Sequence, residues 1–209
     1  LVEKNKVMNL TGITEYEEVI QKHFLDSLSL IRVIPDIASQ KLTVIDLGTG
    51  AGFPGIPLKI AFPELEITLM DSLNKRILFL QEVIDALGLK KVSAVHGRAE
   101  EMASNATHRQ QYDLCVSRAV SNLAVLTEYC LPFVKKGGLF VSYKSADSDA
   151  EIQEGKKAIS ILGGKLTSVD KFQLPDSDLR RALVCIKKVK DTPKKYPRKA
   201  GTPAKLPLK

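Results

Sequence analysis

The chain has few of the features that mark membrane, secreted or metal-binding proteins. Its longest apolar runs fall far short of the ~20 residues that a membrane span needs, and no charged-then-apolar leader opens it. Its three cysteines, Cys115, Cys130 and Cys185, include no C-x-x-C pair, and His96 and His108 have no partner at a metal-ligand spacing. We therefore expect a cytoplasmic protein with buried thiols, without a membrane segment, disulfide framework or metal site.

The composition is that of one ordinary soluble domain. The 209 residues are 44% hydrophobic and 26% charged, which is enough to bury a real core. We expect the protein to be a monomer. The chain opens on Leu1, and the stretch LVEKNKVMNL is typical of the end of a helix, so we also expect that an N-terminal piece is missing.

Acidic residues are almost absent from the end of the sequence. Residues 187–209 hold nine Lys or Arg and one Asp, a net charge of +8, whereas residues 1–186 have a net charge of −1. With four prolines, this tail is predicted not to form a packed element. It is either a solubilising end or an arm for nucleic-acid phosphate. The candidate RNA-binding residues in it are Lys194, Lys195, Arg198 and Lys199.

Apolar periodicity predicts one helix followed by alternating strands and helices. Thr14 and Glu17 have the spacing of a capping box, and Ile20, Phe24 and Leu28 recur at helical intervals, which predicts a helix over 14–33. Further helices are expected over 55–62, 74–87, 121–131 and 149–162. Strands are expected over 42–47, 66–71, 91–97, 112–119, 137–144, 165–174 and 180–189.

These elements predict an α/β fold. Uninterrupted apolar strands between helices are typical of a parallel sheet covered on both faces. The last two strands have no room for a crossover between them and must be antiparallel. We expect a mostly parallel seven-stranded sheet with an antiparallel last strand. The chain then divides into a helical cap segment (1–35), the sheet domain (36–189) and the basic tail (190–209).

The stretch DLGTGAG, residues 46–52, forms a glycine turn after the first strand but lacks the dinucleotide fingerprint. Counted from Gly48, the third glycine of G-x-G-x-x-G would stand at position 53, which is Phe53. Pro54 and Pro57 also remove amide donors that a pyrophosphate would need at the helix start. The turn therefore favours a ligand without a pyrophosphate.

Asp71 closes the second strand, where an acid can accept both ribose hydroxyls of an adenosine. Small residues at the turn would let the methionine part of S-adenosylmethionine lie against the backbone. The pattern is that of class I S-adenosylmethionine methyltransferases, and the expected strand arrangement resembles their fold. The residues predicted to bind this cofactor from the pattern are Asp46, Gly48, Gly50, Gly52 and Asp71.

The motifs of two groups of base methyltransferases are missing. Enzymes that methylate exocyclic amines carry an Asn/Asp-Pro-Pro-aromatic motif after strand four, where this chain reads VSRAVSN with Arg118. None of the three cysteines is placed at a strand end to act as the nucleophile of a carbon-5 cytosine enzyme. With both groups excluded, the remaining target for methylation is an atom that is already nucleophilic.

Several motifs together resemble the bacterial RsmG family, also called GidB, over about residues 5–188. They are HFLDSL (23–28), DLGTGAGFPGIPL (46–58), DSLNKRILFL (71–80), GRAEE (97–101), SRA (117–119) and YKS (143–145). The resemblance implies methylation of N7 of guanine 527 in the 530 loop of 16S ribosomal RNA. It also implies that Gly48, Phe53, Ala99, Glu100 and Arg118 contact the cofactor, with Asp71 nearby.

Guanine N7 needs no general base, so no catalytic residue is assigned. We expect Arg118 and Lys144 to contact the cofactor carboxylate or RNA phosphates. The alternative is that both are ordinary ion-paired surface residues. His23, Asp26 and Ser27 form either a solvated helix surface or part of a cap over the cofactor and RNA site.

The substrate and the class of function stay open in part. Duplex RNA hides N7 in a deep groove, so the target guanine must lie in a loop or be exposed during ribosome assembly. The substrate can be 16S RNA alone, the small ribosomal subunit or its assembly intermediate. The alternatives are a non-catalytic RNA-binding assembly factor, a small-molecule methyltransferase and, third, an NAD dehydrogenase.

Overall fold

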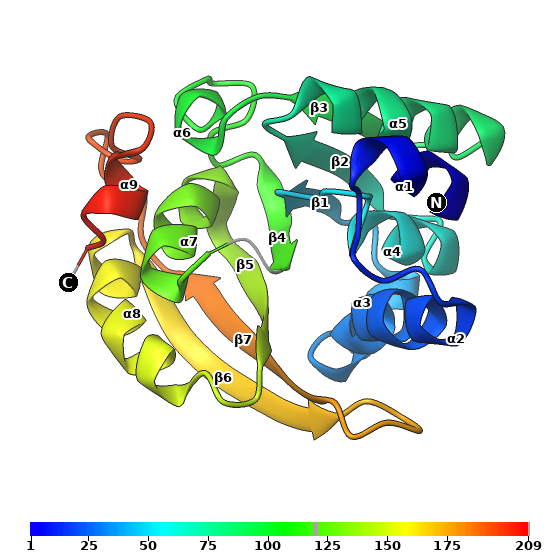
Figure 1. Ribbon diagram of the computed structural model, residues 1–209. Coiled ribbons are helices and arrows are strands. Elements are labelled where there is room, and N and C mark those ends of the chain that lie inside the picture. Colours follow the sequence, from blue (N-terminus) through cyan, green and yellow to red (C-terminus); the bar gives the residue numbers. More distant parts are fainter. Residues whose placement is uncertain (119–120, 209) are drawn as a thin grey trace.

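A seven-stranded sheet with helices on both faces forms the centre of the computed structural model, which describes residues 1–118 and 121–208 (Figure 1). The strand order is β3-β2-β1-β4-β5-β7-β6. Of the seven described strands, β7 alone points opposite to the other six and pairs antiparallel with β5 and β6, so the predicted antiparallel last strand is confirmed. The strands are β1 (Thr43–Leu47), β2 (Glu66–Asp71), β3 (Val92–His96), β4 (Tyr112–Arg118), β5 (Val134–Ser145), β6 (Gly164–Gln173) and β7 (Arg180–Lys188).

The central strands contribute side chains to two cores, one on each face of the sheet. Val44 and Leu69 lie in one buried cluster, and Ile45 and Met70 lie in the other. This follows from the strand geometry, because successive side chains point to opposite faces. The uninterrupted apolar runs in the sequence are therefore explained by a sheet that is covered on both sides.

Helices from different parts of the chain cover the two faces (Figure 1). The face toward α4 and α5 also carries the N-terminal helices, and α7 and α8 cover the other face. Among the described residues, no helix has the length and apolar character needed to cross a membrane. The helices of these two layers are α1 (Val2–Met8), α4 (Gly55–Ala61), α5 (Asn74–Ala86), α6 (Ala99–Met102), α7 (Leu123–Cys130), α8 (Asp149–Ile161) and α9 (Thr202–Lys205), with short 3₁₀ turns at Ile37–Ser39 and Leu131–Phe133.

The N-terminal helical segment differs from the single helix expected over 14–33. It consists of α2 (Tyr16–Val19), a π-helical stretch (Ile20–Leu25), α3 (Asp26–Leu28) and a 3₁₀ turn (Ser29–Arg32). The predicted capping box is wrong, because the N-cap is Glu15 and its side chain makes no capping bond. A hydroxyl further upstream, that of Thr11, instead accepts a hydrogen bond from the Ile13 amide.

The basic tail does pack on the body, so the prediction that it forms no packed element is wrong. We call residues 189–208 the C-terminal strap. The Arg109 guanidinium donates hydrogen bonds of 2.9 Å to the carbonyls of both Thr192 and Tyr196, and the Tyr196 ring is buried in the α7 core cluster. Composition alone does not show these partners, because they lie more than eighty residues away in sequence.

Lys188, the last residue of β7, is a fully buried lysine directly before the strap. Its ammonium nitrogen donates to the Leu131 carbonyl (2.5 Å) and to the Thr192 hydroxyl, which in turn donates to the Leu162 carbonyl (2.8 Å). Burial, helped by the nearby charge of Arg109, lowers the pKa of Lys188 to about 7. The folded chain therefore releases this proton at a lower pH than the unfolded chain does.

Replacing Lys188 with Met is expected to remove a pH-dependent part of the stability. Between pH 7 and 10.5 the unfolded chain binds more protons at this position, so the contribution of Lys188 to stability rises with pH and is lost as the pH falls. From pH 7.5 to pH 9, the unfolding free energy of the native chain should rise by about 1–2 kcal/mol relative to Lys188→Met. Urea denaturation of both proteins at the two pH values checks this, and equal changes in both would contradict it.

Candidate functional site

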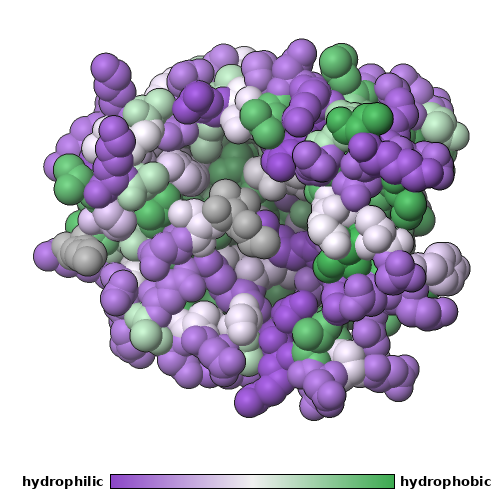
Figure 2. Space-filling model, viewed as in Figure 1, coloured by the Kyte–Doolittle hydropathy of each residue, from purple (hydrophilic) through white to green (hydrophobic). Residues whose placement is uncertain are grey.

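Two cavities lie along the edge where the parallel strands end. The register of the sheet places Asp71, Leu47, Arg118, Ser145 and Arg181 in order along this edge. The glycine-turn cavity, of about 240 Å³, lies at the β2 and β1 end, and the Arg118 cavity, of about 330 Å³, lies at the β4, β5 and β7 end. Figure 2 shows a hollow near the middle of the visible face, with both hydrophilic and hydrophobic residues at its rim. Ligands of such sheets bind at this edge.

The glycine turn follows β1 and needs its glycines for backbone conformation. Gly48, Gly50 and Gly52 have φ angles of 71°, 61° and 93°, in the region that side chains rarely adopt. The Gly50 amide donates a 3.0 Å hydrogen bond to Asp71 Oδ2, which joins the turn to the end of β2. A Cβ on Gly50 would meet no atom within 4 Å, whereas a Cβ on Gly52 would lie 2.6 Å from Ile56. Gly50 therefore borders open space, and Gly52 is required for packing.

Asp46 holds the turn together from beneath. Its Oδ2 accepts hydrogen bonds from the Thr49 hydroxyl (2.6 Å) and the Gly55 amide (2.8 Å). The carboxylate is fully buried, and this burial raises its pKa to about 6. Of the residues predicted to bind the cofactor, five do not belong to the lining of the glycine-turn cavity: Asp46, Gly50, Gly52, Phe53 and Arg118. The structure gives Asp46 and Gly52 a part in shaping the turn.

The glycine-turn cavity brings together residues from five parts of the chain. Asp71 accepts a hydrogen bond from the Leu73 amide (2.9 Å) and pairs with Arg76 (3.1 Å) in addition to Gly50. The predicted residues Gly48, Asp71, Ala99 and Glu100 all line the cavity, together with Leu47, Met70, Ser72, Gly97, Arg98, Tyr129 and Gly201.

Phe53 joins the N-terminal helical segment to the glycine turn. The His23 ring stacks on the Phe53 ring at 4.6 Å between centroids and 15° between planes, and Phe24 meets it edge-on at 5.6 Å. The Arg118 guanidinium lies 5.3 Å from the centroid of the same ring. Such contacts are worth about 0.5–1.5 kcal/mol each beyond area burial. Phe53 thus fixes the helical segment over the turn.

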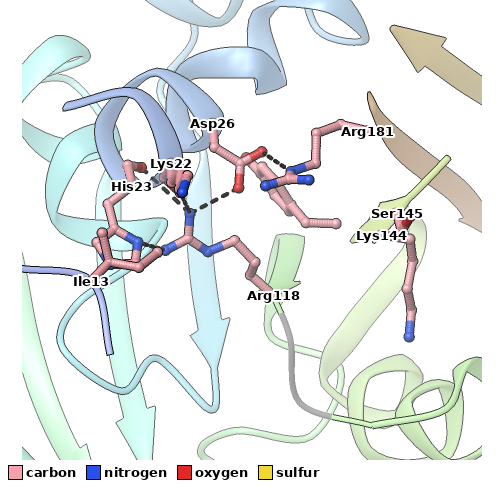
Figure 3. A pocket seen from close by; sticks show the side chains of 9 residues that line it. Ile13, Lys22, His23, Asp26, Arg118, Lys144, Ser145 and Arg181 are labelled. Carbon is pink, nitrogen blue, oxygen red and sulfur yellow. Dashed lines mark hydrogen bonds and ion pairs between the residues drawn. The ribbon is translucent and has the colours of Figure 1, made fainter. Parts of the chain in front are cut away.

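Arg118, at the end of β4, binds this segment from the other side (Figure 3). Its guanidinium pairs with Asp26 Oδ2 at 3.0 Å and donates to the Lys22 carbonyl at 3.1 Å. Arg181, from β7, approaches Asp26 Oδ1 at 3.3 Å. Because the Asp26 side chain is only 5% exposed, it joins two arginines from different strands in a mostly dehydrated cluster, where charge pairs are strong but costly to break.

His23 is held neutral, and both of its ring nitrogens have partners. Arg118 donates to His23 Nδ1 (3.1 Å), so Nδ1 must be an acceptor, and the Nε2–H then donates to the Thr11 hydroxyl at 2.8 Å. Burial, followed by the positive charge of Arg118, lowers the pKa of His23 to about 4.

The described residues that line the Arg118 cavity offer no free general base. Besides His23 and Asp26, Tyr143 donates its hydroxyl to the Ser27 carbonyl at 2.9 Å, and burial raises its pKa far above the ordinary value. Lys22 pairs with Glu18. The cavity is therefore built to position groups and not to accept a proton from a substrate.

Two interpretations of the site residues need correction. His23, Asp26 and Ser27 do not form a solvated helix surface, because Asp26 is 4% exposed and Ser27 is fully buried. Asp26 and Ser27 lie instead on the buried side of the helical segment.

Lys144 is ion-paired, as the alternative expectation requires, but it does not lie on the surface. Its ammonium group pairs with Glu151 at 2.6 Å and donates to the Ser121 carbonyl at 2.5 Å, and its side chain is 12% exposed. In Figure 3 it points away from the cluster formed by Arg118 and Asp26. It is thus neither an exposed surface lysine nor a free cation in the cavity. Ala119 of the SRA motif and of the expected strand 112–119 lies outside the described residues.

In the strap, Lys194, Lys195 and Lys199 are exposed, as an RNA-binding role requires. Arg198 instead forms an ion pair of 2.6 Å with Glu128, which is fully buried on α7. Sequence reasoning missed Glu128, although an acidic residue inside the apolar run LAVLTEYC is a signal for a buried partner. It also missed Arg181 and Tyr129, for which no local signal exists.

Comparisons with known proteins agree with this architecture. A family model described as GidB, rRNA small subunit methyltransferase G, matches residues 1–184. The chain is similar to the ribosomal RNA small subunit methyltransferases G of Lachnoclostridium phytofermentans (60% identical, 100% of this chain and 85% of the relative) and Alkaliphilus metalliredigens (56% identical, 100% and 87%).

Among solved structures, the chain resembles a variant of MtNAS in complex with S-adenosylmethionine. The TM-score is 0.61 at 13% identity, over 90% of this chain and 72% of that chain. This likeness concerns the fold, which is that of the class I methyltransferases. The match to the family model and the identity to its members show more than the fold: the chain belongs to the GidB family of rRNA small subunit methyltransferases.

Proposed function

We propose that the chain is an S-adenosylmethionine-dependent methyltransferase that acts on N7 of a guanine in 16S ribosomal RNA. The glycine-turn cavity takes the adenosine part of the cofactor, and the Arg118 cavity takes the target base. Both cavities open along one sheet edge, at which neighbouring strands lie about 4.8 Å apart. The reactive end of the cofactor, lying past the end of β1, therefore faces β4 and the second cavity.

The residues present fit this cofactor. Asp71 accepts the three donors described above, and an ionised carboxylate has about four acceptor sites, so it retains capacity for a ribose hydroxyl. Gly48 lines the cavity without a side chain, and Ala99 and Glu100 also line it, in agreement with their roles in the family that the sequence resembles. S-adenosylmethionine would supply a methyl group that is already activated for transfer.

The observation that carries the choice of N7 is the lack of a free general base among the described residues of the Arg118 cavity. Guanine N7 holds an unprotonated lone pair at neutral pH and needs no deprotonation, unlike an exocyclic amine. Alignment of N7 with the methyl group then supplies most of the acceleration, a contribution worth up to ~7–11 kcal/mol for well-oriented reactants. Phe53, His23 and Arg118 provide this alignment by fixing the wall of the cavity.

The target guanine must be unpaired, since a duplex hides N7. By family resemblance it is guanine 527 of the 530 loop, in free 16S RNA, the small subunit or an assembly intermediate. Ribosomal RNA as the substrate supports a cytoplasmic location for the protein.

The proposal is tested by transfer of label from S-adenosylmethionine to small-subunit RNA, followed by mapping of 7-methylguanosine. We expect one modified guanine, present in RNA from cells with the protein and absent without it. Modification of another atom would contradict the choice of N7, and RNA binding without transfer would favour a non-catalytic assembly factor.

The exposed lysines of the strap are expected to contact RNA phosphates. Replacing Lys194, Lys195 and Lys199 together with Gln should reduce the slope of log K against log salt by about 2, since each contact to single-stranded RNA contributes about 0.7. Filter-binding titrations from low to moderate salt measure the slope.

The matched control replaces Lys90, Lys136 and Lys187, which are exposed at the opposite edge of the sheet. This variant removes the same charge, so it should leave the slope nearly unchanged. Equal effects of the two triple variants would mean that the strap makes no local contact with RNA.

A further inference from the structure

The C-terminal strap reaches the cofactor end of the molecule. It starts beyond β7, at the edge opposite the site, passes beside α6 and α7 and ends in α9 (Figure 1). Gly201, at the N-cap of α9, lines the glycine-turn cavity together with Asp71, Ala99 and Glu100. The strap therefore supplies part of a wall on which the proposed adenosine site depends.

Gly201 makes a direct contact with a predicted cofactor residue. Its backbone amide donates a 3.0 Å hydrogen bond to Glu100 Oε1. Gly201 has a φ angle of 80°, which glycine adopts without strain. Tyr129, on the same wall, has a raised pKa because of burial and the negative charge of Glu100. The Glu100 carboxylate is thus held between the strap and α7.

Two anchors fix this end of the strap. The backbone amide and the guanidinium of Arg198 donate four hydrogen bonds of 2.6–3.2 Å to the buried Glu128 carboxylate. Arg109 binds the strap carbonyls and also the Ala103 carbonyl at 3.1 Å, directly after α6. Since α6 has only four residues, it depends on these neighbours for its position.

Building on the proposed function, we propose that docking of the C-terminal strap completes the adenosine pocket, with Arg198 and Gly201 as positioning residues that act through Glu100. Strap docking and cofactor binding then stabilise each other, because any coupling between two binding events is reciprocal.

The test measures binding of S-adenosylhomocysteine by calorimetry, well below the melting temperature of every variant. Arg198→Ala should weaken binding about tenfold, within the usual range of coupling between sites. Gly201→Ala should weaken it about threefold, because alanine disfavours the left-handed backbone that presents the amide to Glu100. In turnover, the KM for S-adenosylmethionine should rise by a larger factor than kcat falls.

Gly137→Ala is the matched control for Gly201→Ala. Gly137 has a φ angle of 87° and, like Gly201, no atom within 4 Å of a Cβ, but it lies near the opposite edge of the sheet. It carries the same backbone strain without the contact to Glu100. An affinity loss shared by both variants would overturn the proposal, because it would reflect general destabilisation.

Hydrogen exchange tests the reciprocal effect. S-adenosylhomocysteine should slow exchange of strap amides around Gly201 more than that of the β6–β7 hairpin, and equal protection would contradict the coupling. If the native chain does not bind S-adenosylhomocysteine, the proposed function fails. If it binds and all variants bind equally well, only the role of the strap is overturned.

Discussion

Replacing Arg118 with Ala is expected to lower kcat/KM for methylation of small-subunit RNA by at least about 100-fold. The guanidinium pairs with the buried Asp26 and donates hydrogen bonds to the Lys22 carbonyl and to His23 Nδ1. It also lies over the Phe53 ring. Breaking a buried charge pair costs about 3–5 kcal/mol, and a loss of 2.7 kcal/mol at the transition state is about 100-fold in rate. Initial-rate transfer assays, with circular dichroism to confirm folding, measure this effect.

Arg180→Ala is the control for this experiment. Arg180 is exposed at the start of β7, next to Arg181, and its removal takes away the same charge without disturbing Asp26. Its effect should stay within a few fold. A native rate in Arg118→Ala would contradict the role of the Asp26 cluster. The rate of Arg118→Lys should fall between those of Arg118→Ala and Arg180→Ala, because lysine keeps the charge but lacks the planar set of donors of a guanidinium.

Replacing Arg198 with Ala is expected to reduce the unfolding free energy by about 3 kcal/mol. Glu128 is fully buried, so the substitution leaves a carboxylate without its charged partner, retaining only the backbone amide of residue 198. Chemical denaturation measures the loss. Lys199→Ala, at the exposed neighbouring position, should change stability by less than about 0.5 kcal/mol.

A second substitution separates the charge penalty from lost packing. In the Arg198→Ala/Glu128→Leu double variant no charge is left buried, so much of the stability should return. If the double variant is as unstable as Arg198→Ala, the loss comes from detachment of the strap and not from the unpaired carboxylate.

The sheet was predictable because its signals are local. The run from Glu66 to Asp71 matches β2, since a short apolar stretch between turn residues depends on burial alone. The glycine turn and Asp71 were also identified as parts of one site, because their spacing reflects the strand-to-helix geometry.

The rest depends on partners distant in sequence. Arg198 forms an ion pair with Glu128, which lies seventy residues away in sequence. The strap packs because of such contacts, although its composition is typical of an unfolded tail. Asp26 meets Arg118 and Arg181 across three elements, so helical spacing alone placed it on a solvated face. Adjacent arginines at 180 and 181 are equivalent in sequence, and only the register of β7 determines which one faces Asp26.

The stacking of His23 and Arg118 around Phe53 also has an optical consequence. The sequence contains no tryptophan, so Phe53→Trp would introduce a single indole at the contact between the helical segment and the turn. Its emission spectrum would report, without interference from any other indole, whether that segment is seated or displaced while RNA enters and leaves.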